Sequence, residues 1–204
     1  MRKTKEKQEK ILESSISIFL DKGFSKTKIS DIAIKAGIGK GTVYEYFESK
    51  DNIFKECVKY ILDTHMQHIL RELDGLTDGV DKLQTFARIH YKYTTEHGNT
   101  LSNLSKECNE VVGNEIMQLM IKYRVMLIEK IEKILNEDLK IPKAHINQKF
   151  DSRKIALIFL GSINQYIIDK LLVEQECKEE TLSDIVEFTQ DLLNLIYGMS
   201  PLAI

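Results

Sequence analysis

The sequence predicts an all-α fold of about nine helices, and three observations support this prediction. The 204 residues include only two prolines and ten glycines, and tryptophan is absent, which suits long helices with short connectors. Apolar residues recur at helical spacing along most of the chain. The hydrophobic fraction of 43% is large enough for a substantial core.

Charge is distributed unevenly along the chain. Residues 1–50 hold eleven Lys/Arg and seven Asp/Glu, a net of +4, whereas the remainder holds eighteen and twenty-four, a net of −6. An electropositive N-terminal part ahead of an acidic remainder favours contact with nucleic acid through that part. A basic N-terminus that only aids solubility is the alternative.

The first helix is expected to end at about Lys22, because Gly23 follows at a position typical of a helix C′ residue. Residues 2–10 are basic. They are expected either to be frayed until DNA is present or to stay a solvated tail, and both alternatives remain open. The inner face of the helix carries Ile11, Leu12, Ser15, Ile18 and Phe19.

Two short helices around a tight turn are predicted between Thr27 and Lys50. Thr27 is the expected N-cap of the first, whose apolar residues keep helical spacing as far as Ala36. Gly37 follows where the chain requires a left-handed backbone conformation. The second helix runs from about Lys40 to Glu48. Small residues beside a glycine turn are typical of a helix-turn-helix that reads DNA.

The second short helix has one face that is expected to meet DNA. Val43 and Phe47 point inward, and the opposite face carries Gly41, Tyr44, Glu45 and Glu48. Gly41 would let the backbone approach DNA closely. Lys40 could reach a phosphate or a guanine edge, and Thr42 could reach a phosphate or a base.

This stretch resembles the DNA-binding signature of the tetracycline-repressor (TetR) family. The resemblance covers about the first quarter of the chain. It implies a helix-turn-helix DNA-binding domain over residues 1–50 and an effector-binding and dimerisation domain over residues 51–204, connected by a helix over residues 50–73. The residues that carry the resemblance are Thr27, Ile29, Ile32, Ala33, Ala36, Gly37, Ile38, Lys40, Gly41, Thr42, Val43, Tyr44, Tyr46, Phe47 and Lys50, with Ile11, Phe19, Gly23 and Phe24 before them and Ile53 and Phe54 after them.

The exposed face and the resemblance together give ten candidate DNA-binding residues. Glycine at position 39, where members often have serine, lacks a hydroxyl but can still act as an N-cap. Glu45 could accept a hydrogen bond from cytosine N4 or lie in solvent. Tyr46 could hold a phosphate or be a core aromatic with a hydrated hydroxyl. The ten residues are Thr27, Lys28, Gly39, Lys40, Gly41, Thr42, Tyr44, Glu45, Tyr46 and Lys50.

Six helices are expected after the helix-turn-helix. Ser49 caps the first, which ends near Leu73. Asp151 is the expected cap of the penultimate helix, and Thr181 with Asp184 resembles a capping box for the last. The other five helices are expected over residues 78–96, 100–112, 114–139, 151–175 and 181–198, with one long connector over residues 136–147.

The penultimate helix is apolar over most of its circumference between Ile155 and Ile168. More apolar face than one core needs implies a partner surface, so we expect a twofold-symmetric dimer through a four-helix bundle. A helix fully buried in one subunit is the alternative. The expected interface residues are Ile158, Gly161, Ser162, Gln165, Phe188 and Leu195.

The resemblance also implies a cavity for a small effector. Its candidate residues are polar or soft side chains on otherwise apolar helix faces, although ordinary core packing is the alternative for each of them. Asn164 is the most indicative, because an amide within an apolar helix requires a partner. The candidates are His65, Met66, Tyr91, Met117, Met120, Tyr123, Asn164 and Tyr166.

Other functions have little support in the sequence. His65 and His68 have the spacing of a metal pair but lack a third ligand, so neither a metal nor a cofactor is predicted. No nucleotide-binding loop, GxSxG or HExxH motif indicates an enzyme. Three cysteines without a CxxC pair, and the lack of a secretory or membrane-spanning segment, favour a cytoplasmic chain without a membrane partner.

The prediction is therefore a homodimeric repressor that binds a palindromic double-stranded DNA operator and is released by an unidentified small-molecule effector. The alternative is a DNA-binding regulator or structural factor that is controlled by a protein partner and has no small ligand.

Overall fold

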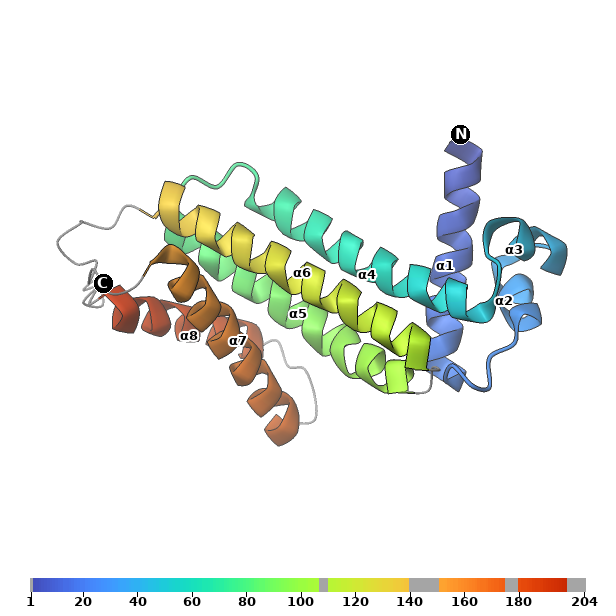
Figure 1. The fold of residues 1–204 in the computed structure, drawn as a ribbon. Coiled ribbons are helices and arrows are strands. Elements are labelled where there is room, and N and C mark those ends of the chain that lie inside the picture. Colours follow the sequence, from blue (N-terminus) through green and yellow to red (C-terminus); the bar gives the residue numbers. More distant parts are fainter. Residues whose placement is uncertain (1, 107–109, 140–150, 175–179, 198–204) are drawn as a thin grey trace. The chain divides into compact units, whose positions relative to one another are not determined.

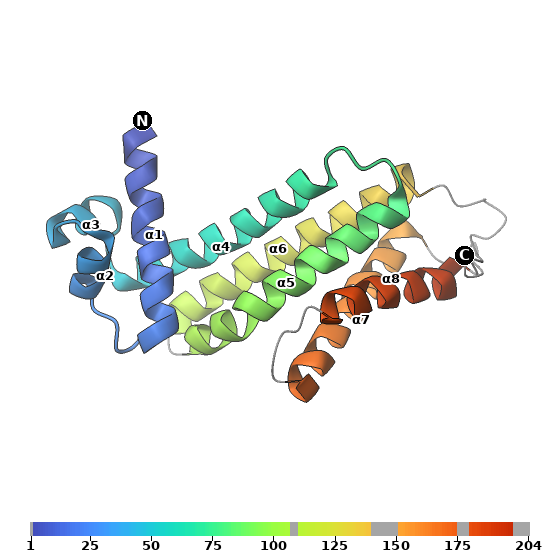
Figure 2. The same cartoon turned by 180° about the vertical axis from the view of Figure 1, so that it is seen from behind.

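Eight α-helices and no strand make up the part of the chain that the computed structural model describes, which comprises residues 2–106, 110–139, 151–174 and 180–197 (Figures 1 and 2). Side chains are described within residues 4–97, 111–139, 151–170 and 182–196. The prediction of an all-α fold is confirmed. The helices are α1 (Arg2–Lys22), α2 (Ile29–Ala36), α3 (Lys40–Tyr46), α4 (Lys50–Leu73), α5 (Gly79–Lys106), α6 (Glu110–Glu137), α7 (Ser152–Glu174) and α8 (Glu180–Tyr197).

The difference between nine expected and eight observed helices lies in α5. Two helices are predicted over residues 78–96 and 100–112, but residues 79–106 form a single helix that continues through Gly98, and residues 110–112 belong to the next helix. A single glycine inside a helix costs only about 1 kcal/mol relative to alanine. It therefore does not have to end a helix.

Several helix ends fall where the sequence places them. Gly23 and Gly75 have φ angles of 79° and 85°, which are left-handed conformations directly beyond α1 and α4. The Ser49 hydroxyl accepts a hydrogen bond from the backbone N–H of Asn52 at 3.0 Å, as expected of an N-cap. Asp151 accepts one from the backbone N–H of Lys154 at 2.8 Å.

The N-terminal basic segment differs from its prediction, because α1 begins at Arg2 and residues 2–10 are helical. The predicted capping box of the last helix includes the Thr181 side chain, and the predicted connector includes residues 140–147. Both lie outside what the structure describes.

The chain divides into two compact units. Unit 1 comprises residues 1–64 and 98–122, and unit 2 comprises residues 65–97 and 123–204. Helices α4, α5 and α6 therefore each contribute to both units. The division at residue 50 into a DNA-binding and an effector domain stays a prediction.

Unit 1 is held together by aromatic packing between α1 and α4. The Phe54 ring lies 5.4 Å from Phe19, edge to face, and 5.2 Å from Phe24, as measured between ring centroids. The Cys57 thiol donates a hydrogen bond to the Leu12 carbonyl at 3.6 Å, and burial raises the pKa of this thiol. Ile53, Phe54 and Cys57 of α4 are all buried.

Unit 2 has a large apolar core from five helices. The start of α5 lies tightly against the end of α6, where a Cβ on Gly79 would stand 2.7 Å from the Leu139 Cα. Lys82 forms an ion pair with Asp138 at 2.6 Å at the same place. None of the described helices is long and apolar enough to cross a bilayer. Side chains in this core that are less than 1% exposed are Ile69, Leu83, Phe86, Ala87, Ile131, Ala156, Phe159, Leu160, Ile163, Ile167, Ile185 and Leu193.

Candidate nucleic-acid interface

The turn between α2 and α3 has the geometry that the sequence predicts. Gly37 has a φ of 67°, a left-handed conformation that costs other residues about 1–2 kcal/mol. The N–H groups of Gly37 and Ile38 donate to the carbonyls of Ile34 and Ala33 at 3.1 and 3.0 Å. Ala33 itself is buried. The turn therefore closes α2 and redirects the chain into α3.

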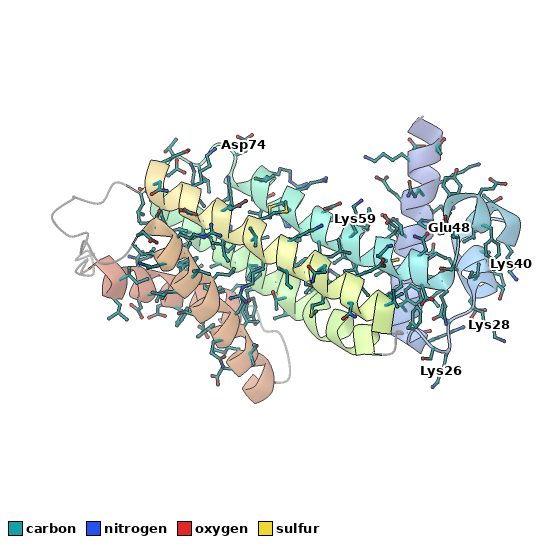
Figure 3. The ribbon with its side chains drawn as sticks, in the orientation of Figure 1. Lys26, Lys28, Lys40, Glu48, Lys59 and Asp74 are labelled. Atoms are coloured by element: carbon teal, nitrogen blue, oxygen red, sulfur yellow. The ribbon has the colours of Figure 1, made fainter. Side chains whose placement is uncertain are left out.

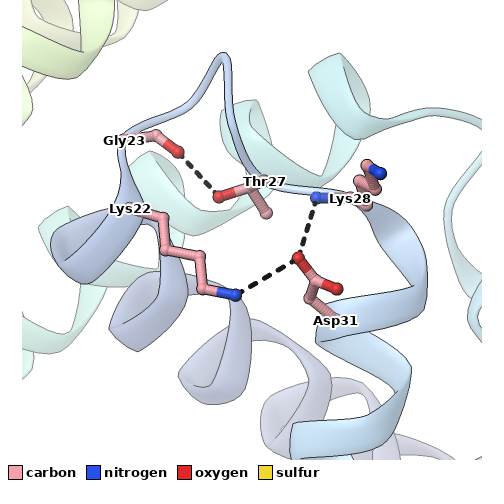
Figure 4. A network of polar contacts seen from close by, with 5 residues as sticks. All are labelled: Lys22, Gly23, Thr27, Lys28 and Asp31. Carbon is pink, nitrogen blue, oxygen red and sulfur yellow. Dashed lines mark hydrogen bonds and ion pairs between the residues drawn. The ribbon is translucent and has the colours of Figure 1, made fainter.

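The start of α2 differs from its prediction, because Lys28 rather than Thr27 is the N-cap. The Thr27 hydroxyl donates to the Gly23 carbonyl at 2.7 Å, as Figure 4 shows, and Thr27 is buried. The Asp31 carboxylate instead accepts hydrogen bonds from the Lys28 N–H and the Lys22 ammonium, both at 3.5 Å. The Thr27 hydroxyl, which is predicted to contact DNA, therefore already donates a hydrogen bond within the protein.

Helix α3 buries one face and exposes the other, as predicted. Val43 and Phe47 are at most 1% exposed. The helix ends at Tyr46 rather than Glu48, because Phe47 already has the extended angles φ −139° and ψ 128°. The predicted outward residues Gly41, Tyr44, Glu45 and Glu48 are all exposed.

The exposed face of α3 leaves room for a close approach of DNA. A Cβ on Gly41 or on the N-cap residue Gly39 would meet no atom within 4 Å. The Lys40 ammonium lies 5.8 Å from the centroid of the Tyr44 ring, one helical turn away. Thr42 and Tyr46 are half-buried beside this face.

Exposed lysines project from this helix-turn-helix. Figure 3 shows Lys26, Lys28 and Lys40 standing out from it, and all three are exposed. Lys26 is not among the ten predicted DNA-binding residues, because it precedes the motif. Its spacing of two residues from Lys28 is the signal that could have found it.

Lys50 has a structural role in addition to the phosphate contact that the resemblance implies. Its ammonium donates to the Phe24 carbonyl at 2.8 Å and lies 4.3 Å from the centroid of the Phe24 ring. The first turn of α4 is thereby attached to the segment before α2. A phosphate would have to share this ammonium with the carbonyl.

Comparison with known proteins agrees with this geometry. Residues 11–57 match the model of the bacterial regulatory proteins of the tetR family. These residues form a TetR-family domain. The transcriptional regulator HbdR of Aromatoleum sp. strain CIB is 36% identical over 78 residues of this TetR-family chain, which are 38% of the chain and about a third (34%) of HbdR.

Two further comparisons extend over almost the whole TetR-family chain. The negative transcriptional regulator IcaR of the biofilm operon icaADBC in Staphylococcus aureus is 26% identical over 193 residues, 92% of this chain and 97% of IcaR. The regulator FadR of Bacillus subtilis, solved in complex with stearoyl-CoA, superimposes with a TM-score of 0.63 at 18% identity over 94% of this chain and 98% of FadR. The relatives are named regulators rather than enzymes, in agreement with the prediction.

Replacing Lys40 by alanine in this TetR-family protein is expected to weaken DNA binding and reduce its salt dependence. Loss of one phosphate contact lowers the slope of log K against log salt by about 0.9. Fluorescence anisotropy at several salt concentrations measures this slope. Lys59→Ala is the matched control, because it removes the same charge at an exposed position of α4, and an unchanged slope for Lys40→Ala would remove Lys40 from the phosphate contacts.

The predicted effector residues of the TetR-family protein lie in different surroundings. His65, Met66 and Tyr91 are buried, whereas Met117 and Met120 are 52% and 41% exposed on α6. The structure brings His65 and Tyr123 together through a hydrogen bond between the Tyr123 hydroxyl and His65 Nδ1. Of the remaining two candidates, Asn164 and Tyr166, Asn164 is bonded to His90, which the sequence analysis did not select.

The predicted dimer residues lie on α7 and α8. Ile158 and Leu195 are 41% and 82% exposed, and Gln165 is also exposed. Gly161 and Ser162 are half-buried, and a Cβ on Gly161 would meet no atom within 4 Å. Phe188 instead stacks on Tyr166 of α7, with ring centroids 4.5 Å apart.

Proposed function

We propose that this TetR-family protein binds a palindromic operator as a homodimer and represses transcription until a small molecule releases it. The observation that carries the proposal is the open, exposed face of α3 directly beyond the left-handed turn at Gly37. A helix held in this way is suited to the major groove. The candidate DNA-binding residues are the ten that the sequence analysis selects, together with Lys26.

The small size of α3 supports a dimer. Seven residues reach only a few base pairs, which is too little for specific binding by one subunit. Two copies of α3 in successive major grooves of one DNA face would lie about 34–36 Å apart.

The apolar surface of α7 supports a dimer through this helix. Phe159, Ile163 and Ile167 are fully buried on its inner face, while Ile158 and Ile168 remain 41% and 48% exposed. Apolar residues on a second face gain stability only when another surface covers them. We propose a symmetric bundle of α7 and α8 from two copies.

Control by a small molecule is proposed on the resemblance to the family and on the relatives. IcaR is named a negative regulator, and FadR was solved with stearoyl-CoA, so a protein of this fold accommodates an acyl thioester. A ligand that binds the DNA-free form better by about 1–3 kcal/mol would shift the equilibrium away from the operator. We propose that it does so by tilting α4, in a protein that acts in the cytoplasm.

A protein partner without a small ligand is the second candidate for control. The exposed apolar side chains of α6 favour it, because Met117, Met120 and Ile121 share one helix face and are 41–52% exposed. A partner helix could cover such a stripe. This candidate would gain support if no small molecule changed the affinity for DNA.

The substitution Gly161→Glu is expected to split the dimer. Two carboxylates would face each other across the symmetry axis, and juxtaposed like charges cost several kcal/mol, so the dimer dissociation constant should rise about 100-fold or more. Analytical ultracentrifugation measures this change. Because a Cβ at position 161 would meet no atom of its own subunit within 4 Å, the monomer should stay folded.

The control is Gln67→Glu, which adds the same charge at an exposed position of α4. It should leave both the dimer and operator affinity unchanged, whereas Gly161→Glu should weaken both. A stable dimer of the Gly161→Glu protein would mean that the interface lies elsewhere.

A further inference from the structure

Five polar side chains form a cluster inside unit 2 that the proposed function leaves unexplained. The imidazole of His65 on α4 stacks on the Tyr93 ring of α5 at 3.7 Å, with the two planes 4° apart. It also lies 5.5 Å from the parallel imidazole of His90. Tyr123 on α6 and Asn164 on α7 complete the set. We call these five residues the polar ring cluster.

The hydrogen bonds within the cluster determine which of its donor and acceptor atoms remain free to bind another molecule. His90 Nε2 lies 2.9 Å from the Asn164 side-chain oxygen. Because this oxygen can only accept, Nε2 carries the proton and Nδ1 of His90 is a free acceptor. The Tyr123 hydroxyl pairs with Nδ1 of His65, so only Nε2 of His65 remains available.

Three buried polar atoms of the cluster have no hydrogen-bond partner among the described residues. They are His65 Nε2, His90 Nδ1 and the Tyr93 hydroxyl oxygen. The two histidines are 1% and 6% exposed. Buried polar groups are nearly always paired, and three unpaired ones in a single set of stacked rings point to a molecule that pairs them. Phenylalanine would fill the same space without this cost.

The cluster is uncharged at neutral pH. Burial lowers the pKa of His65 to about 2 and lowers the pKa of His90, while it raises the pKa of the Tyr93 and Tyr123 hydroxyls. The titratable groups that lower the pKa of His65 further are other histidines, namely His90, His68 and His97. A charged group of a ligand would find no opposite charge among them, and burying an unpaired charge is very unfavourable.

We propose that the polar ring cluster binds an uncharged compound through a hydroxyl or amide group that both donates and accepts hydrogen bonds. The apolar body of the compound would lie against neighbouring rings such as Phe86, whose centroid is 5.7 Å from that of His90. The inference rests on the proposed control by a small molecule. It names the chemical class of that molecule.

Phenol is the smallest probe of this class, and toluene and benzoate are its apolar and anionic counterparts. We expect phenol to shift the ring-nitrogen resonances of His65 and His90 in the full-length protein labelled with ¹⁵N-histidine. Toluene and benzoate should leave them in place. Shifts of equal size with toluene, or shifts with benzoate alone, would overturn the assignment.

The substitution Tyr93→Phe removes one unpaired hydroxyl and keeps the ring. It should weaken phenol binding about tenfold, as expected for one lost hydrogen bond, while the ligand-free protein melts at the same or a higher temperature. Tyr60→Phe is the control, because the Tyr60 hydroxyl is bonded to Glu13 in unit 1, and its phenol affinity should match the parent. Unchanged phenol affinity of Tyr93→Phe would show that the cluster is ordinary core.

Binding of the same preparation to duplexes selected from a random library separates this inference from the proposed function. Selective DNA binding without a response of His65 and His90 to phenol would overturn the inference alone. A phenol response without any selective DNA binding would overturn the proposed function and leave the ligand site standing.

Discussion

Replacing Gly41 by leucine is expected to reduce operator affinity about 10³-fold, to the level of binding to unrelated DNA. A Cβ at this position would meet no atom of the protein within 4 Å, so we expect the leucine side chain to project from the exposed face of α3 towards the floor of the groove. The clash would then be with DNA alone. Anisotropy titrations at one fixed salt concentration measure the loss.

Two controls accompany this experiment. The melting temperature of the Gly41→Leu protein should change little, because the side chain points into open space. Gln67→Leu places the same side chain at an exposed position of α4 and should keep the parent affinity. If Gly41→Leu bound the operator normally, the start of α3 could not be the part that enters the groove.

Mild acid is expected to destabilise the protein through the polar ring cluster. The pKa of His65 is about 2 in the folded chain and 6.5 as its ordinary value, so below pH 6.5 the unfolded chain takes up a proton that the folded chain does not. The full stability of the folded chain is therefore present above pH 6.5, and the free energy of unfolding decreases as the pH falls below that value. A histidine whose pKa is lowered in this way reduces the free energy of unfolding by about 1.4 kcal/mol for each pH unit below 6.5. At pH 4 the reduction is about 3 kcal/mol.

Urea unfolding at pH 7, 5.5 and 4 tests this expectation. The pKa of His90 is lowered as well, so His90 adds to the loss in the same direction. The substitution His65→Phe keeps a ring in the stack but cannot take up a proton. Its free energy of unfolding should fall less steeply with pH than that of the parent, and parallel curves for the two proteins would rule out His65 as the cause.

The helices and the helix-turn-helix could be predicted because their signals are local. The spacing of Ala33, Gly37 and Val43 depends only on neighbouring residues, and both the left-handed turn and the buried Val43 are observed. The cap of α2 could not be predicted in the same way. Thr27 has a suitable side chain, but the fold places the Gly23 carbonyl within its reach, and the hydroxyl bonds there instead.

The candidate effector residues were harder to predict because helix periodicity does not show which helix faces meet. His90, Tyr93 and His97 repeat at spacings of three and four along α5, but only the packing against α4 and α7 brings His90 and Tyr93 to His65 and Asn164. Conversely, α6 has apolar residues around more of its circumference than one core can cover. Its methionines at positions 117 and 120 were therefore selected although they are exposed.

The attachment of Lys50 to Phe24 has a mechanical consequence. A cation–π contact and a hydrogen bond join the first turn of α4 to the segment that precedes α2. When α4 rotates, the segment before α2 should therefore rotate with it. A change of the angle between them would break both interactions of Lys50 at once. Replacing Lys50 by alanine would remove both interactions and let the two segments move independently.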